Sequence, residues 1–259
     1  MRVLPYGRCV TDRVRDPKWT DGKEYGMHDW QAERDWPLLT QGLAGRLRND
    51  CMVQWLEFVH HPFVKSVGDG TLAPGAFRNF LIQDYLYLIQ YARACAVAVH
   101  KSDTVAGMRH AAHLLSGILN TELSMHVAYC AGWGIDEAAL EQAEESLELL
   151  AYSRFILDRA LTGDLLDLLV TMAPCLIGYA ELGARLHADP ATKREGNPYW
   201  SWIALYGGAE YTELVEEGIH RLEQVGAACG AQARYPVLLG EFATSVRLET
   251  AFWATARPA

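Results

Sequence analysis

Met172-Ala-Pro-Cys-Leu-Ile-Gly-Tyr179 is the most informative stretch of this chain, because it sets a thiol and a phenol inside an apolar helical pattern. Cys175 and Tyr179 are four residues apart, so both side chains lie on one face of a helix. Pro174 removes one backbone hydrogen bond from that helix and favours a kink. A polar, thiol-bearing face is unusual in the middle of a core helix, which makes this stretch the first candidate for a functional site.

The same helical spacing of apolar residues extends outward from this stretch over most of the chain. It holds over residues 43–59, 74–100, 104–130, 135–160, 161–186, 199–225 and 235–256. Proline and glycine separate the helical segments, as at His61-Pro62 and at Gly132-Trp-Gly134. The sequence contains no strand, hairpin or repeat pattern. We therefore predict an all-α fold, a helical bundle in a single domain.

Residues 1–37 differ from the rest, because they mix prolines and glycines with many charges and hold no helical or alternating pattern. We predict a partly irregular N-terminal extension over residues 1–37, ahead of an all-α catalytic domain over residues 38–259. The extension is expected to pack through Trp19, Trp30 and Trp36. We assign no catalytic role to it.

Composition restricts the class of protein. Half of the 259 residues are hydrophobic, which is enough for a sizeable core. The net charge of −9 argues against nucleic-acid binding, which needs a basic surface.

The six cysteines form no CxxC pair and are irregularly spaced, as the reduced thiols of cytosolic proteins are. The N-terminus lacks the apolar core of a signal peptide, and the uncharged run 168–180 is too short to span a bilayer. We expect a cytoplasmic protein that binds neither nucleic acid nor a membrane.

Asp84 is a carboxylate on an aromatic helix face, which it shares with Phe80, Tyr87 and Tyr91. Burying such a group is costly unless it meets a partner. Asp84 is therefore either a ligand-binding group or an edge residue bonded to a tyrosine hydroxyl or a backbone amide. This helix alone leaves both interpretations open.

Glu249 is a second carboxylate in aromatic surroundings, because Phe252 and Trp253 share its helix face. A carboxyl in such a place can have a raised pKa, which suits it to proton transfer near neutral pH. The alternative is an exposed glutamate paired with Arg247 or another basic side chain.

Glu122 and His126 lie on one helix face, which is half of the pattern of a carboxylate-bridged metal site. Such a site needs further inward Glu-x-x-His pairs. That spacing is missing around the other candidate ligands, which are His100, His110, His113 and Glu181. We therefore favour an intrahelical hydrogen bond over a metal site and predict no metal.

Four short segments belong together: Gln83-Asp-Tyr-Leu-Tyr87, Pro174-Cys-Leu-Ile-Gly-Tyr179, Trp202-Ile-Ala-Leu-Tyr206 and Glu249-Thr-Ala-Phe-Trp253. In this order and at about these separations, they resemble the TenA family, which comprises thiaminase II and aminopyrimidine aminohydrolase. The resemblance extends from Leu38 to the C-terminus. The thiol of Cys175 places the chain beside the cysteine-bearing members of that family.

The resemblance implies a heme-oxygenase-like bundle that forms a homotetramer and uses no cofactor. It also implies a hydrolase of thiamin salvage, which cleaves the methylene C–N bond of aminomethylpyrimidine, and of thiamin, to give hydroxymethylpyrimidine. Cys175 would then add to the pyrimidine ring as the nucleophile, and Glu249 would protonate or hold a ring nitrogen. Asp84 would bind the amidine edge of the ring. The tyrosines that would stack on the ring and bond its polar atoms are Tyr87, Tyr152, Tyr179 and Tyr206.

Two other classes of function fit the same fold. An oxidase would use a quinone cofactor, which needs basic residues, or a metal pair, which needs at least four inward ligands, and neither set is evident in the sequence. A non-catalytic pyrimidine binder or regulatory protein would keep Cys175 as a small buried hydrophobe. Its replacement by serine or alanine would then leave ligand binding intact.

Overall fold

The structure of the chain is a computed structural model that describes residues 36–39 and 41–257. The predicted N-terminal extension, residues 1–37, lies outside these ranges except for its last two residues. The packing expected of Trp19 and Trp30 therefore stays a prediction.

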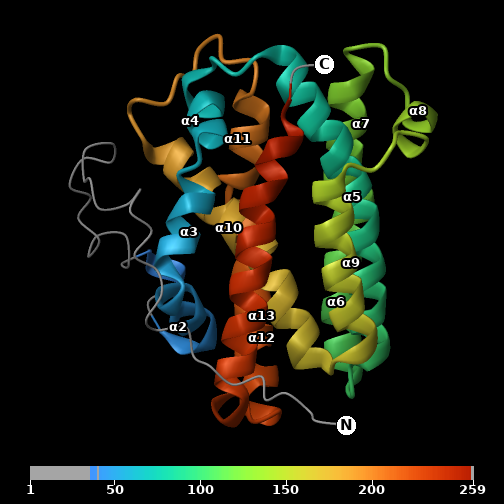
Figure 1. The fold of residues 1–259 in the computed structure, drawn as a ribbon, viewed down its shortest axis with the longest axis vertical. Helices are drawn as coiled ribbons and strands as arrows, with labels where there is room; N and C mark the ends of the chain where they lie inside the picture. Colours follow the sequence, from blue (N-terminus) through green and yellow to red (C-terminus); the bar gives the residue numbers. More distant parts are fainter. Residues whose placement is uncertain (1–35, 40, 258–259) are drawn as a thin grey trace, which may run out of the picture. The chain divides into compact units, whose positions relative to one another are not determined.

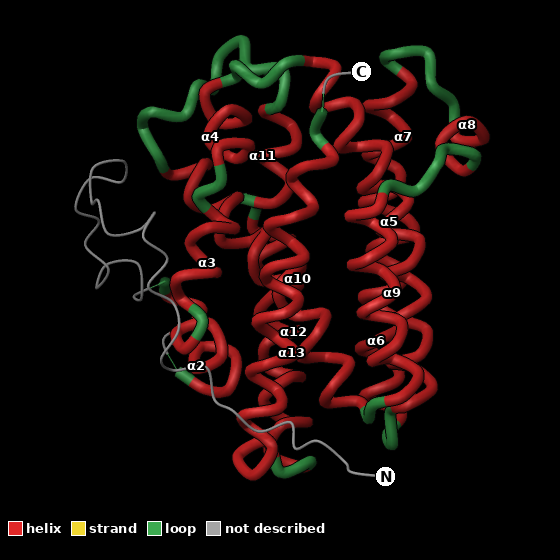
Figure 2. The backbone as a smooth tube through the Cα atoms, viewed as in Figure 1, coloured by secondary structure: helices red, strands yellow, loops and turns green. Residues whose placement is uncertain are grey.

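The described residues form helices and no strand, so the all-α prediction is confirmed (Figure 2). The α-helices are α2 (Gly42–Asp50), α3 (Met52–Val59), α4 (Pro62–Asp69), α5 (Pro74–Lys101), α6 (Val105–Gly117), α7 (Leu123–Ala131), α8 (Glu137–Glu141), α9 (Leu147–Thr162), α10 (Leu165–Ala188), α11 (Trp200–Tyr206), α12 (Ala209–Ala228) and α13 (Ala231–Phe252). Two short 3₁₀ turns, η2 (Pro37–Leu39) and η4 (Trp253–Thr255), flank them.

Helix α10 is the central element of the bundle. It packs against α13, α12, α11 and α9, while α5 packs against α6, α9 and α7 (Figure 1). Most of α10 is buried, and its amino-acid composition would also suit a membrane span. Because 78% of its apolar window lies inside the bundle, α10 has the character of a core helix.

A π-helical turn, η3 (Ile118–Glu122), joins α6 to α7 without a break. The buried residues Ile118 and Leu123 lie five positions apart across this turn, instead of three or four. Compared with an uninterrupted α-helix of the same sequence, the π-helical turn rotates all residues beyond it by about 100° around the helix axis. The turn therefore determines which side chains of α7, His126 among them, face α5.

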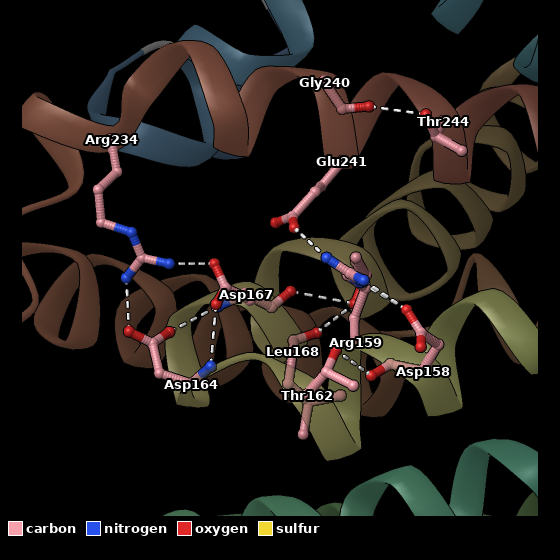
Figure 3. Close-up of polar contacts among 11 residues, drawn as sticks. Asp158, Arg159, Thr162, Asp164, Asp167, Leu168, Arg234, Gly240, Glu241 and Thr244 are labelled. Atoms are coloured by element: carbon pink, nitrogen blue, oxygen red, sulfur yellow. Dashed lines mark hydrogen bonds and ion pairs between the residues drawn. The ribbon is translucent and has the colours of Figure 1, made fainter. Parts of the chain in front are cut away.

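The N-terminus of α10 is fixed to α13 by a polar network (Figure 3). Asp164 caps α10 in a reciprocal capping box with Asp167. Arg234 of α13 bonds to both carboxylates, with a distance of 2.5 Å to Asp164 Oδ2. Arg159 of α9 bonds to Glu241 of α13 at 3.3 Å. Such half-exposed ion pairs contribute about 0–1 kcal/mol each, so their main effect is to set the position of α10 relative to α13.

A buried ion pair holds the other half of α10. Arg48 of α2 and Glu181 of α10 are both fully buried, and the guanidinium bonds the carboxylate through two nitrogens at 2.8 and 2.7 Å. Trp55 Nε1 and Arg185 also donate to Glu181. Because removing one member would leave a buried charge behind, this cluster ties α10 firmly to α2 and α3.

Candidate active site

Cys175 lies in the middle of α10, one residue after Pro174. The backbone around the proline is held from two neighbouring helices: Tyr91 Oη of α5 donates to Met172 O at 3.1 Å, and Ser245 Oγ of α13 donates to Thr171 O at 2.9 Å. Side-chain hydroxyls thus bond carbonyls in the turn that the proline weakens. The turn that carries the thiol is consequently fixed on both sides.

The structure brings the predicted site residues together around this turn, from five helices. Asp84 and Tyr87 come from α5, Tyr152 from α9, Tyr179 from α10 together with Cys175, Tyr206 from α11 and Glu249 from α13. All of them are buried except Cys175, which is half-buried. Their roles toward a substrate remain predictions.

Asp84 is a buried carboxylate with a charged partner. His126 Nε2 lies 2.8 Å from Asp84 Oδ2, and His126 Nδ1 lies 2.8 Å from the backbone carbonyl of Glu122. A carbonyl and an ionised carboxylate are both acceptors, so the imidazolium form, in which both ring nitrogens donate, satisfies both contacts. Burial alone would lower the pKa of His126, but the hydrogen bond and charge of Asp84 raise it. Asp84 and His126 therefore form a neutral ion pair in the wall of the site.

Glu249 is buried and accepts a hydrogen bond of 2.7 Å from the hydroxyl of Tyr152. Burial raises the pKa of Glu249 to about 8, against a smaller lowering by the Tyr152 bond. The alternative of an exposed glutamate beside Arg247 is therefore wrong. Near neutral pH this carboxyl holds a proton and is close to giving it up, which suits a group that donates and accepts protons.

The Cys175 thiol lies between Glu249 and Tyr87. Burial raises its pKa well above the usual value, and the charges of Glu249, Glu122 and Asp84 raise it further. Activated cysteines usually lie beside positive charge, and this one lies among carboxylates. The resting group is therefore a thiol, and an attack by this sulfur would require it to pass its proton to a neighbour.

Aromatic rings line the space around the thiol. Tyr87 and Tyr152 are stacked with their ring centres 4.9 Å apart, and Phe252 lies 5.5 Å from Tyr87. Tyr179 and Tyr206 meet edge to face at 4.9 Å. The buried Tyr87 hydroxyl lies beside Cys175, yet among the described residues it makes no hydrogen bond of ordinary geometry. Aromatic faces with such a polar atom suit a flat heteroaromatic ligand.

Glu122 and His126 are the site residues that sequence analysis did not assign. The predicted hydrogen bond within their helix exists, but it joins His126 to the backbone of Glu122. The Glu122 carboxyl instead lies near Asp84 and near the hydroxyl of Tyr206, which lowers its pKa. The four-residue spacing of the pair was a usable signal, but the sequence did not show that α5 lies opposite.

Over residues 36–39 and 41–257, no group of three or more His, Cys, Asp and Glu side chains is arranged to hold a metal ion. A small cavity of about 40 Å³ lies beside the site, between α5, α6, α10 and α12. It shares Tyr91, Met172 and Leu176 with the surroundings of the site. Its lining is mainly apolar and does not include Cys175, Asp84 or Glu249, so these predicted site residues lie outside it.

Comparison with known proteins shows which family this chain matches. The TENA/THI-4/PQQC family matches residues 50–259. A protein of Halalkalibacterium halodurans named aminopyrimidine aminohydrolase is 36% identical over 202 residues, which are 77% of this chain and 88% of that protein. A crystal structure from Silicibacter sp. TM1040, described as a TenA family transcription regulator, is 35% identical and aligns with a TM-score of 0.77 over 83% of this chain and 96% of that one.

The fold prediction is confirmed by a third similarity. A domain of unknown function with a heme oxygenase-like fold, from Shewanella denitrificans OS217, aligns with a TM-score of 0.64 over 82% of this chain and 90% of that one. At 15% identity this similarity concerns the fold alone. With a family match over residues 50–259 and the site in place, the chain belongs to the TENA/THI-4/PQQC family.

Proposed function

We propose that this protein is a C–N hydrolase of thiamin salvage, which converts an aminomethylpyrimidine and water into hydroxymethylpyrimidine and ammonia. The observation that carries the proposal is the position of the Cys175 thiol, beside the proton-holding carboxyl of Glu249 in a site walled by tyrosines. The relative named aminopyrimidine aminohydrolase supports the substrate class. Thiamin, which carries the same pyrimidine on its methylene, is the second substrate.

Recognition of the pyrimidine follows from the walls of the site. The ring stacks against the tyrosine faces, in particular the stacked pair Tyr87 and Tyr152. The ion pair of Asp84 with His126 fixes the carboxylate in place, so that it accepts from the exocyclic amino group on the amidine edge. A fixed acceptor orients the ring and sets its reactive carbon against the sulfur of Cys175.

The amine on the methylene is a poor leaving group, and a covalent step through Cys175 makes its departure possible. Sγ of Cys175 forms a bond to a ring carbon, its proton passes to Glu249, and Glu249 gives a proton to a ring nitrogen, which takes up the displaced electron pair. The electron pair of the ring then expels the amine, so that the C–N bond breaks and an exocyclic methylene group remains. Water adds its hydroxyl there, and its other proton goes to the departed ammonia. The C–S bond then breaks, and the proton of the ring nitrogen returns through Glu249 to the sulfur, which restores the thiol. The net reaction consumes one alkylammonium and one water and yields one alcohol and one ammonium.

A regulatory role is the second candidate, because one solved relative is described as a transcription regulator. The net charge of −9 does not suit DNA binding. A non-catalytic binder would also have no use for a thiol and a raised-pKa carboxyl in contact. Hydrolysis accounts for both groups, and we therefore prefer it.

The cytoplasmic location remains a prediction from the sequence composition, and the homotetramer remains a prediction from the family resemblance. Multi-angle light scattering of the purified chain measures the second of them. A mass of four times 28.9 kDa is expected.

The first experiment measures hydroxymethylpyrimidine and ammonia formed from aminomethylpyrimidine without added metal. The native chain should turn over, and Cys175→Ser should lose several orders of magnitude in kcat, about 10³-fold or more, because the nucleophile is gone. Cys229→Ser, which changes an exposed cysteine, is the matched control and should keep native activity. Equal activity in all three proteins would contradict the role of Cys175. A folded native protein that turns over neither aminomethylpyrimidine nor thiamin would contradict the salvage function itself.

A further inference from the structure

The proposed reaction gives no task to Glu122, although its carboxyl belongs to the site. Glu122 is the last residue of the π-helical turn and lies one helical turn before His126. Its carboxyl lies near the hydroxyl of Tyr206 and near the side chains of Asp84 and His126. It is also among the charges that act on the Cys175 thiol. The π-helical turn, an irregularity that is frequent at functional sites, is what presents it there.

Glu122 is more exposed than most of the other site residues. Asp84, Glu249 and the four predicted tyrosines are buried, with exposed fractions of 4% or less. Glu122 and Cys175 are the half-buried members of the group. These two residues therefore keep some accessible surface, while the remaining residues of the group are closed off from solvent.

The charge state of Glu122 also differs from that of the other two carboxyls in the site. The charge of Asp84 is balanced by His126, and Glu249 holds a proton near neutral pH because its pKa is about 8. Burial raises the pKa of Glu122 to about 7, while the charge of His126 lowers it and the charge of Asp84 raises it. The other titratable groups around it are Tyr91 and Cys95 of α5, Cys175 of α10, Tyr206 of α11 and Tyr211 of α12. A cation brought by the substrate would keep Glu122 ionised and be bound by it.

We propose that Glu122 is the leaving-group subsite of this enzyme: its carboxylate binds the aminomethyl nitrogen of the substrate as an alkylammonium ion and so selects pyrimidines with a cationic leaving group. This inference rests on the proposed function. When the C–N bond breaks, its electron pair leaves with the nitrogen, so the bound alkylammonium departs as neutral ammonia and no proton has to be delivered to it. Glu122 thus holds the amine in its best leaving form next to the methylene carbon.

A purely structural role for Glu122 would be to hold Tyr206 in place. That role predicts an equal loss of affinity for every pyrimidine when the carboxylate is changed. The subsite predicts a loss confined to the ligand that carries an amine. The two ligands that separate these cases are aminomethylpyrimidine and hydroxymethylpyrimidine, because they differ only in the group on the methylene.

The test measures the binding of both pyrimidines by calorimetry at neutral pH, in the chemically inert Cys175→Ser protein. We expect the added change Glu122→Gln to reduce the preference for the amine by about 10- to 100-fold and to alter the affinity for the alcohol by less than about threefold, since a charge-assisted hydrogen bond is lost. Glu122→Asp, which keeps the charge, should retain part of the preference and serves if the glutamine variant does not fold. Glu213→Gln, an exposed change on α12, is the matched control for removing one negative charge.

An unchanged ratio of the two affinities, or an equal loss of both, would overturn the subsite while leaving the proposed function in place. If the Cys175→Ser protein binds neither pyrimidine, the proposed function is wrong and the subsite is wrong with it.

Discussion

At the scale of single residues, the site depends on carboxyl groups whose surroundings differ. Asp84 meets the imidazole of His126, Glu249 meets the phenol of Tyr152 and the thiol of Cys175, and Glu122 lies near the phenol of Tyr206. Sequence analysis found the first two because a carboxylate stood among aromatic residues. It could not assign their partners, since His126 and Tyr152 lie on other helices, 42 and 97 residues away along the chain.

The bond between Tyr152 and Glu249 leads to a prediction about pH. Tyr152→Phe removes the hydroxyl that stabilises the ionised carboxyl, so the pKa of Glu249 should rise further above about 8. Because the proposed mechanism needs the protonated carboxyl as a donor to the ring, the alkaline limb of the kcat/KM profile should move to higher pH. The value of kcat/KM at neutral pH should fall by about 10- to 100-fold, because the carboxyl loses its orientation.

Tyr235→Phe is the matched control for this measurement. It removes a comparable bond, of 2.7 Å to Asp50, at the far end of α13 from Glu249. Its pH profile should coincide with that of the native protein. An unshifted alkaline limb in Tyr152→Phe would mean that Glu249 is not the titrating donor.

At the scale of elements, apolar spacing predicted most helices, and the differences have local causes. The expected helix over residues 135–160 is reduced to α8 and α9, because Asp136 and Ser146 each cap a new helix through their side chains. The expected helix over residues 199–225 divides at Gly207-Gly208 into α11 and α12. There the backbone of Gly207 approaches α10 so closely that a Cβ would lie 2.7 Å from the carbonyl oxygen of Gly183. A pattern of apolar residues carries no information about such contacts.

The π-helical turn between α6 and α7 was not predictable, since it needs only one extra residue in an otherwise regular spacing. Inserting one alanine after Asn120, whose side chain is exposed, adds a second extra residue to this turn and should rotate α7 by about 100° relative to α6. His126 would then lose its contact with Asp84, and both activity and pyrimidine binding should disappear.

Asn120→Ala keeps the length of the turn and removes only the side-chain bonds to Ser116, so it should retain native activity within about threefold. Circular dichroism of the insertion variant checks that the helices remain. Native turnover by a folded insertion variant would show that the register of α7 does not position the site.

At the scale of the whole molecule, the buried carboxyls that serve the site are expected to destabilise the fold. Glu249 has a folded pKa of about 8 against 4.5 for the unfolded chain, so the folded protein binds more protons between these values. The free energy of unfolding therefore falls as pH rises through this window, by an amount on the order of 4 kcal/mol for this group. Glu122 adds to the same trend, since its pKa is raised to about 7.

Thermal unfolding of the native chain and of Glu249→Gln, between pH 5.5 and pH 8, measures this contribution. The native Tm should fall with rising pH more steeply than the Tm of the variant, by several degrees over the range, about 2–4 °C for each kcal/mol. Parallel curves would mean that Glu249 titrates at an ordinary pKa in the folded protein.

The fold and the site were predictable from sequence to different extents. The all-α bundle followed from spacing alone, and four short motifs contain every predicted site residue except Tyr152. The structure added the partners of those residues, the half-buried position of Cys175 and the presence of Glu122. These depend on how α5, α7, α10 and α13 meet, which no single segment of the sequence encodes.

The central claim is that this chain hydrolyses the methylene C–N bond of an aminomethylpyrimidine through Cys175. The most direct measurement is turnover in water labelled with a heavy oxygen isotope, followed by mass spectrometry of the product and a count of ammonia. The account predicts hydroxymethylpyrimidine whose hydroxyl oxygen comes from the labelled water, one ammonia for each product, and no product from Cys175→Ser. An oxidised pyrimidine, product without the label, or full turnover by Cys175→Ser would contradict it.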